Sequence, residues 1–263
     1  MHRLVTVGLL LVILGLALLL LLPGVMMVRE VGNRQRCADN LRKIIAATLL
    51  WSDQANPQLA DRQVALPPGT LPHPQLPPAR RLSLIVDLLP LLGVDLPIDR
   101  QQSWDAPTQY PAIEKVIPTL CSPETFLAPA PGQPGQTYYV ALAGLGTDAA
   151  ELPADHPRAG PFRYDQATPL TAIRDGTGHT IAWLEAARRP APWAQGGPAT
   201  VRGLDPDERP YLSLHGPFGG GHRTFAHTAF CDGSIRPIAY TISPTVFEAL
   251  ATIAANDGGV DAN

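Results

Sequence analysis

The N-terminal part of the chain holds its longest apolar run. The segment "LVTVGLLLVILGLALLLLLPGVMMV", residues 4–28, contains no charged residue. As a helix rising about 1.5 Å per residue it would reach roughly 37 Å, enough to cross a hydrocarbon layer of about 30 Å. A buried core helix rarely runs so long without a charge, and the following "PGVMMVRE" is a poor cleavage site for a signal peptide. The pattern therefore predicts an uncleaved transmembrane anchor that contacts the lipid bilayer.

Apolar residues keep a helical spacing beyond this run. Five positions of "REVGNRQRCADNLRKIIAATLLWSDQ" share one helical stripe: Leu41, Ile44, Ile45, Thr48 and Leu49. The charged residues lie mostly on the other side. We therefore expect one long helix from about Leu4 to about Asp53, whose continuation over residues 29–55 packs on a soluble body.

The next part of the chain predicts short elements. Residues 56–80 are too rich in proline for a helix and indicate an extended linker. "RRLSLIVDLLPLLG" indicates a short amphipathic helix. Three runs bounded by turn residues indicate strands: "KVIPTLCSP", "QTYYVALAG" and "HTIAWLEAA". "TPLTAIRDGTG" predicts a short helical turn that Asp175 and Gly176 close ahead of a strand.

The C-terminal part predicts a hairpin and a helix. "RTFAHTAFC" and "SIRPIAY" flank Asp232-Gly233, a strong signal for a β-hairpin with a type I′ turn. "SPTVFEALATIAANDGG" predicts a closing helix with Ser243 as its cap, Pro244 in its first position and Gly258 after its end.

Together these elements predict an α+β fold. We expect a single body over residues 81–258, built on a mainly antiparallel sheet with short helices, followed by a tail over 259–263. No internal repeat and no second core-sized unit is evident in the sequence.

Composition and motifs narrow the function. The formal net charge of −3 gives no reason to expect binding of nucleic acid. The sequence has no nucleophile elbow, phosphate-binding loop, dinucleotide fingerprint or HExxH pair. We therefore expect a protein without catalytic activity and without a cofactor.

The run "GGGHRTFAHTAFCDGSIRPI" raises the question of a metal or catalytic site. Residues five apart on a strand point to opposite faces, and even with His222 ahead of the strand the geometry does not favour one cluster of His222, His227 and Asp232. Their spacing matches no zinc pattern. We therefore expect no metal ligands here. His222 should hydrogen-bond the backbone at the hairpin base, while Asp232 and Gly233 form the turn.

Two loops have residues that suggest a binding role, although a simpler interpretation is favoured for each. The acidic residues of "GLDPDERP" are candidate calcium ligands, although an EF-hand pattern is absent and a solvated loop is commoner: Asp205, Asp207 and Glu208. "PHPQLPP" has the composition of a polyproline ligand, and a linker across the body surface is the simpler interpretation.

The order of these motifs resembles a bacterial family of pilin-like (pseudopilin-like) proteins, abundant in planctomycetes and classed as a domain of unknown function. "LLPGVMMVRE" is similar to its "LLPAVQAARE" segment, "NRQRCADNLRKI" to "RR.QC.NNLKQI", and "IRDGTGHTIAWLE" to "ITDGTSNTI...E". The family's C-terminal signature is a histidine, nine residues and Asp-Gly, which His222, Asp232 and Gly233 match. The chain lacks the prepilin signature Gly-Phe-Thr-Leu-Val-Glu and has no acidic residue inside its apolar run, which argues against filament polymerisation.

The resemblance implies where the body lies. Pilin-like proteins place it outside the cytoplasmic membrane, whereas the positive-inside rule favours the cytoplasm because basic residues follow the run: Arg29, Arg34, Arg36, Arg42 and Lys43. Following the family, we expect a single-pass inner-membrane protein with an extracytoplasmic body. It would be a type II secretion-like structural or interaction protein, and its expected partners are other pilin-like or envelope proteins. A tethered solute-binding module is the alternative.

Cysteine positions add one further expectation. Cys37 and Cys121 lie in two segments with family-like motifs, and Cys231 lies in the strand before the Asp-Gly turn. In an oxidising compartment, a Cys37–Cys121 disulfide would tie the long helix to the sheet. The alternative is three reduced, buried cysteines.

Overall fold

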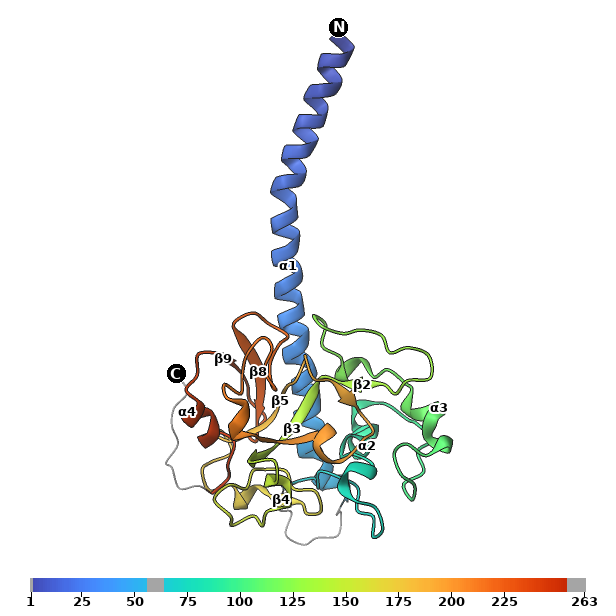
Figure 1. Ribbon diagram of the computed structural model, residues 1–263, viewed down its shortest axis with the longest axis vertical. Helices are drawn as coiled ribbons and strands as arrows, with labels where there is room; N and C mark the ends of the chain where they lie inside the picture. Colours follow the sequence, from blue (N-terminus) through green and yellow to red (C-terminus); the bar gives the residue numbers. More distant parts are fainter. Residues whose placement is uncertain (1, 56–63, 255–263) are drawn as a thin grey trace.

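The computed structural model describes residues 2–55 and 64–254, with the side chains of 2–5, 9–14, 16–27 and 53–55 outside the description. The chain forms one long helix joined to an α+β body (Figure 1). The helices are α1 (His2–Ala55), α2 (Ile85–Leu88), α3 (Tyr110–Ile113) and α4 (Pro244–Ala249). The strands are β1 (Ala65–Leu66), β2 (Gln136–Thr137), β3 (Tyr139–Leu145), β4 (Thr168–Pro169), β5 (Ile181–Glu185), β6 (Ala191–Pro192), β7 (Val201–Leu204), β8 (Phe225–Phe230) and β9 (Ile235–Ala239).

Helix α1 has two parts with different surroundings. Its N-terminal half projects away from the body, and its C-terminal half lies along the sheet (Figure 1). The single long helix predicted from periodicity is confirmed, and it continues through Pro23. Among the described residues, no helix has both the length and the apolar character that a membrane span needs. Most of the apolar run 4–28 lies outside the described side chains.

The body is organised around a five-stranded sheet in the order β7-β3-β5-β8-β9. Three of its pairings are antiparallel, and β7 pairs with β3 in parallel. Two small antiparallel pairs, β1 with β4 and β2 with β6, lie outside this sheet. The mainly antiparallel α+β fold predicted from the sequence is therefore confirmed.

Both faces of the central sheet are buried. Because side chains alternate along each strand, neighbouring residues pack in different cores. Tyr139 and Ala141 of β3 pack in the core shared with α1, where Ile44 also lies. Val140 and Leu142, the alternate positions, pack on the opposite face in a second core with α4. The sheet is thus the central layer between α1 and α4.

Three local predictions need correction. "KVIPTLCSP" is not a strand: it forms a 3₁₀ turn over Pro118–Leu120, which begins at a proline with no N–H for a ladder. Residues 64–80 are not a free linker, because β1 pairs with β4 and Leu66 is fully buried. The closing helix ends at Ala249, and the side chain of Ser243 makes no capping hydrogen bond. Residues 56–63, 255–258 and the tail 259–263 lie outside the described residues.

The predicted β-hairpin is confirmed, with a different turn. Phe230 N donates to Ser234 O at 2.9 Å, and Gly233 N donates to Phe230 O at 2.9 Å. The loop therefore has three residues, and Gly233 at φ 87° occupies the left-handed position of a bulged turn rather than of a two-residue type I′ turn.

Candidate functional site

A cluster of buried polar side chains lies where α1 crosses the sheet. Cys37 comes from α1, Glu185 is the last residue of β5, and His222 lies in the loop ahead of β8. Cys37 and Glu185 are fully buried, and His222 is 1% exposed. Their ligand atoms, one thiol sulfur, one carboxylate oxygen and one imidazole nitrogen, all lie within 4.8 Å of one another.

Local sequence explains how two of these side chains reach the cluster. Cys37 precedes Leu41 and Ile44 on the buried stripe of α1, so it faces the sheet. Glu185 ends a strand, "IAWLE", whose five positions are all buried. Burying an ionisable group in such a strand is costly unless it has partners, so a Glu at the end of an otherwise apolar strand is a sequence signal for a buried polar site.

The Glu185 carboxyl group has one bound and one free oxygen. The backbone N–H of His227 donates to Oε2 at 2.9 Å. Oε1 accepts no hydrogen bond from a nitrogen or oxygen donor and lies 3.9 Å from His222 Nε2, and the Cys37 thiol is the neighbouring donor to this carboxyl group. Burial raises the pKa of Glu185 to about 7, against the lowering effect of the His227 N–H.

His222 is oriented by a carboxylate. Its Nδ1 lies 3.1 Å from Glu124 Oε1, whereas Nε2 is buried and has no partner. The ring stacks on Phe225 with centroids 4.7 Å apart, and the His222 carbonyl accepts a hydrogen bond from the Tyr240 hydroxyl at 2.8 Å. Burial lowers the pKa of His222 to about 4. The predicted hydrogen bond from this side chain to backbone is therefore wrong, because the ring is turned toward Glu124.

His227 adjoins the cluster, contrary to the expectation that the two histidines diverge. Its ring meets that of His222 edge-on with centroids 5.2 Å apart, and neither ring nitrogen has a hydrogen-bond partner. Burial lowers its pKa to about 4. Strand alternation failed here because β8 begins at Phe225, so His222 precedes the strand and is not bound by its period.

Asp232, the third member of the sequence pattern, lies apart from the histidines in the hairpin turn. Its Oδ1 accepts a hydrogen bond from Ser234 N at 2.8 Å, which is a turn role as predicted. Gly176, with φ 94°, closes the turn after Asp175 ahead of β5, also as predicted.

The predicted Cys37–Cys121 disulfide is not formed in this structure, in which all three cysteines are free. Cys121 Sγ donates to Ile117 O at 3.3 Å, while Cys37 lies beside Glu185. Burial and then the neighbouring Glu185 raise the pKa of the Cys37 thiol, and burial raises the pKa of Cys121 to about 11. The helix is held to the body by packing and hydrogen bonds rather than by this bridge.

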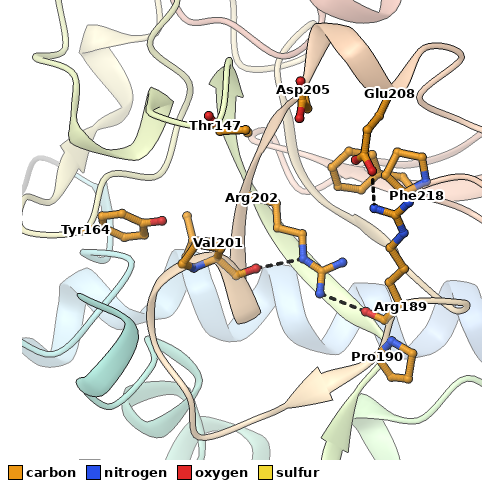
Figure 2. A pocket seen from close by; sticks show the side chains of 12 residues that line it. Thr147, Tyr164, Arg189, Pro190, Val201, Arg202, Asp205, Glu208 and Phe218 are labelled. Atoms are coloured by element: carbon orange, nitrogen blue, oxygen red, sulfur yellow. Dashed lines mark hydrogen bonds and ion pairs between the residues drawn. The ribbon is translucent and has the colours of Figure 1, made fainter. Parts of the chain in front are cut away.

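A second feature is an open cavity beside β7, with a volume of about 430 Å³ (Figure 2). Tyr164 and Phe218 supply aromatic surface, while Arg189 forms an ion pair of 2.6 Å with Glu208. Arg202 donates to the carbonyl of Arg189 at 2.9 Å, and burial lowers its pKa to about 10. Asp205 and Glu208, two of the three candidate calcium ligands, line this cavity, and the third, Asp207, is exposed.

The two features differ in chemistry. The cavity can receive a small molecule with apolar and polar parts. The buried cluster offers sulfur, nitrogen and oxygen donors, which are the ligand types of zinc. From the sequence, Cys37 was predicted to form a disulfide and His222 to hydrogen-bond the backbone at the hairpin base. Glu124 and Glu185 had no predicted role, although Glu185 is the last residue of the family-like segment "IRDGTGHTIAWLE".

Residues 26–204, more than half of the chain, match the model of a protein family, SBP_bac_10, described as "Protein of unknown function (DUF1559)". Cys37, Glu124 and Glu185 lie inside this match, and His222 lies beyond it. No curated protein and no solved structure matches the chain.

Proposed function

The chain belongs to this family of proteins of unknown function, and we propose that it acts as a membrane-anchored, pilin-like body of the cell envelope, presenting its surface to partners without catalysing a reaction. The division of α1 carries the proposal. One half projects from the body and contains the uncharged run 4–28, while the other half packs on the sheet (Figure 1).

The packed half of α1 supports the pilin-like part of the proposal. Leu41, Ile44 and Ile45 are at most 2% exposed and share one core with the sheet. A long N-terminal helix laid on an antiparallel sheet is the arrangement that the pilin resemblance implies. Because the apolar run has no acidic residue, we propose a permanent anchor rather than a polymerising subunit.

The orientation can be tested by labelling a cysteine at exposed Asp207 in intact cells with a membrane-impermeant maleimide. Cys37 and Cys231 are buried and stay in place, while partly exposed Cys121 is replaced by serine. Labelling of Asp207→Cys without lysis supports the extracytoplasmic body, and labelling only after lysis refutes it. The Cys121→Ser parent without the added cysteine must remain unlabelled.

The anchor itself needs a separate test. Leu16→Arg places a charge near the middle of the run, where it costs about 2.5–3.5 kcal/mol of insertion free energy. We expect less of the variant in the alkali-resistant membrane fraction than of wild type. The conservative control is Leu16→Ile. A wild-type chain that is fully released by alkali would remove the anchor from the proposal.

The cavity beside β7 favours a second candidate function, a tethered solute-binding module. Its volume of about 430 Å³ falls in the range of small-molecule sites. NMR titration of the full chain with a panel of small anionic and neutral solutes tests this function. Saturable shifts at Tyr164 and Phe218 would support it, and their absence at high millimolar solute would remove it.

A further inference from the structure

The buried cluster contains polar atoms that the fold leaves without partners. Glu185 Oε1, His222 Nε2 and Ser122 Oγ are all buried and make no hydrogen bond. Glu185 Oε1 and Ser122 Oγ border one space, because a Cβ added at Gly221 would lie 3.5 Å from the first and 3.6 Å from the second, and His222 Nε2 lies 3.9 Å from Oε1. Native proteins seldom leave several such atoms unsatisfied at one place, so the convergence calls for an occupant.

The orientation of His222 indicates the charge of that occupant. When Nδ1–H donates to Glu124, Nε2 carries a lone pair and no proton. This lone pair faces Glu185 Oε1 across 3.9 Å, which is too long for an O–H···N hydrogen bond. Two acceptors that face each other at this separation are stabilised by a cation bonded to both.

We propose that Cys37 Sγ, the Glu185 carboxylate and His222 Nε2 bind a divalent transition-metal ion of the zinc class. Zinc takes sulfur at about 2.3 Å and nitrogen or oxygen at about 2.0–2.2 Å, so its tetrahedral ligands lie roughly 3.3–3.6 Å apart. The three ligand atoms all lie within 4.8 Å of one another, and His222 Nε2 and Glu185 Oε1 are 3.9 Å apart, so side-chain shifts of up to about 1 Å bring them to these separations. The fourth position is left for a water molecule.

The surrounding contacts are those of a supported metal site. Glu124 holds the non-ligating nitrogen of His222, which is the carboxylate–histidine–metal arrangement. The His227 N–H holds the second oxygen of Glu185 and leaves Oε1 directed at His222. When the metal binds, Cys37 releases its thiol proton to solvent and the thiolate bonds the ion. The ion would join α1, β5 and the loop ahead of β8.

Cobalt(II) binding by the full chain in detergent tests the proposal, because a thiolate ligand gives an intense near-ultraviolet charge-transfer band. After chelator treatment and removal of the chelator, we expect one equivalent of Co²⁺ to produce the band and Zn²⁺ to abolish it. A wild-type protein that shows no such band, and retains no Zn²⁺ through gel filtration, overturns the proposal.

Variants assign the ligands. Cys37→Ser should abolish the band, while the matched Cys231→Ser and Cys121→Ser retain it. His222→Ala keeps every thiol and should weaken Co²⁺ binding at least 10-fold, and Glu124→Gln, which changes only the positioning residue, about 10–100-fold. A band that persists in Cys37→Ser overturns the proposal. If Cys37→Ser fails to fold by circular dichroism, Glu124→Gln and His222→Ala decide, and unchanged affinity in both overturns it.

Discussion

Trp183 Nε1 donates a hydrogen bond to Thr48 Oγ1 at 3.1 Å, joining β5 to α1 inside the core. The same Thr48 hydroxyl donates to Ile44 O at 2.8 Å, so both its hydrogen and a lone pair are used. Trp183 and Thr48 are both fully buried. The contact fixes the rotation of α1 about its axis, and with it the direction in which Cys37 points.

This bond should contribute measurably to stability. Thr48→Val keeps the side-chain volume and leaves the Trp183 N–H buried without an acceptor, which costs about 1–3 kcal/mol. Urea unfolding of Thr48→Val, Trp183→Phe and the double variant gives the coupling energy between the two positions. We expect a coupling of about 1 kcal/mol or more. Losses that simply add would show that the bond contributes nothing.

The free energy of unfolding, measured against pH in the presence of a chelator, should show the titration of the Glu185 carboxyl group. Its folded pKa of about 7 lies above the ordinary value of 4.5, so the folded state holds a proton that the unfolded state releases. This contribution is complete below pH 4.5 and is lost as the pH rises through 7, by on the order of 3 kcal/mol. The residues with ionisable side chains around this carboxyl are Cys37, Glu124, Tyr139, His222, Tyr240 and His227, the last of which contacts it through its backbone N–H.

His222 and His227 change the stability in the opposite direction as the pH falls. Because their folded pKa values are about 4, against 6.5 ordinarily, the unfolded state binds their protons first and stability falls as the pH falls through that window. Comparison with Glu185→Gln removes this background. The stability of wild type relative to Glu185→Gln should rise as the pH falls from 7 to 4.5. A difference that does not change with pH would contradict the assignment.

Backbone contact between β3 and β7 should make Gly203 intolerant of a side chain. A Cβ at Gly203 would overlap the carbonyl oxygen of Gly146, which cannot move without separating the two strands. We expect Gly203→Ala to lose about 2 kcal/mol or more in thermal or urea unfolding. The control is Gly32→Ala on exposed α1, where a Cβ meets no atom within 4 Å and should gain about 0.5–1 kcal/mol. Equal stability of the two variants would refute this packing.

Thiol counting should distinguish the structure from the disulfide predicted from the sequence. With all three cysteines free, protein denatured without reductant should react with three equivalents of thiol reagent. Reduction before denaturation should not change the count. A count of one would restore the Cys37–Cys121 bridge, and mass spectrometry of the alkylated peptides identifies which cysteines reacted.

The local elements were largely predictable. The stripe through Leu41 and Ile44 predicted the packed half of α1, and the alternation around Asp232-Gly233 predicted the β8–β9 hairpin. Failures occurred where tertiary contacts replaced local preference. Leu66 lies in a proline-rich stretch whose composition predicted a linker. It is part of the body because it is fully buried and its strand, β1, pairs with β4.

Local residue patterns were enough to predict the long helix, the hairpin and the α+β class, because helix and strand periods are carried by neighbouring residues. The meeting of Cys37, Glu185 and His222, and the separate place of Asp232, follow from how distant segments pack together. Those three residues belong to a helix, a strand and a loop that are far apart along the chain. Their convergence depends on the crossing of α1 over β5 and on the path of the chain before β8, which no local pattern encodes.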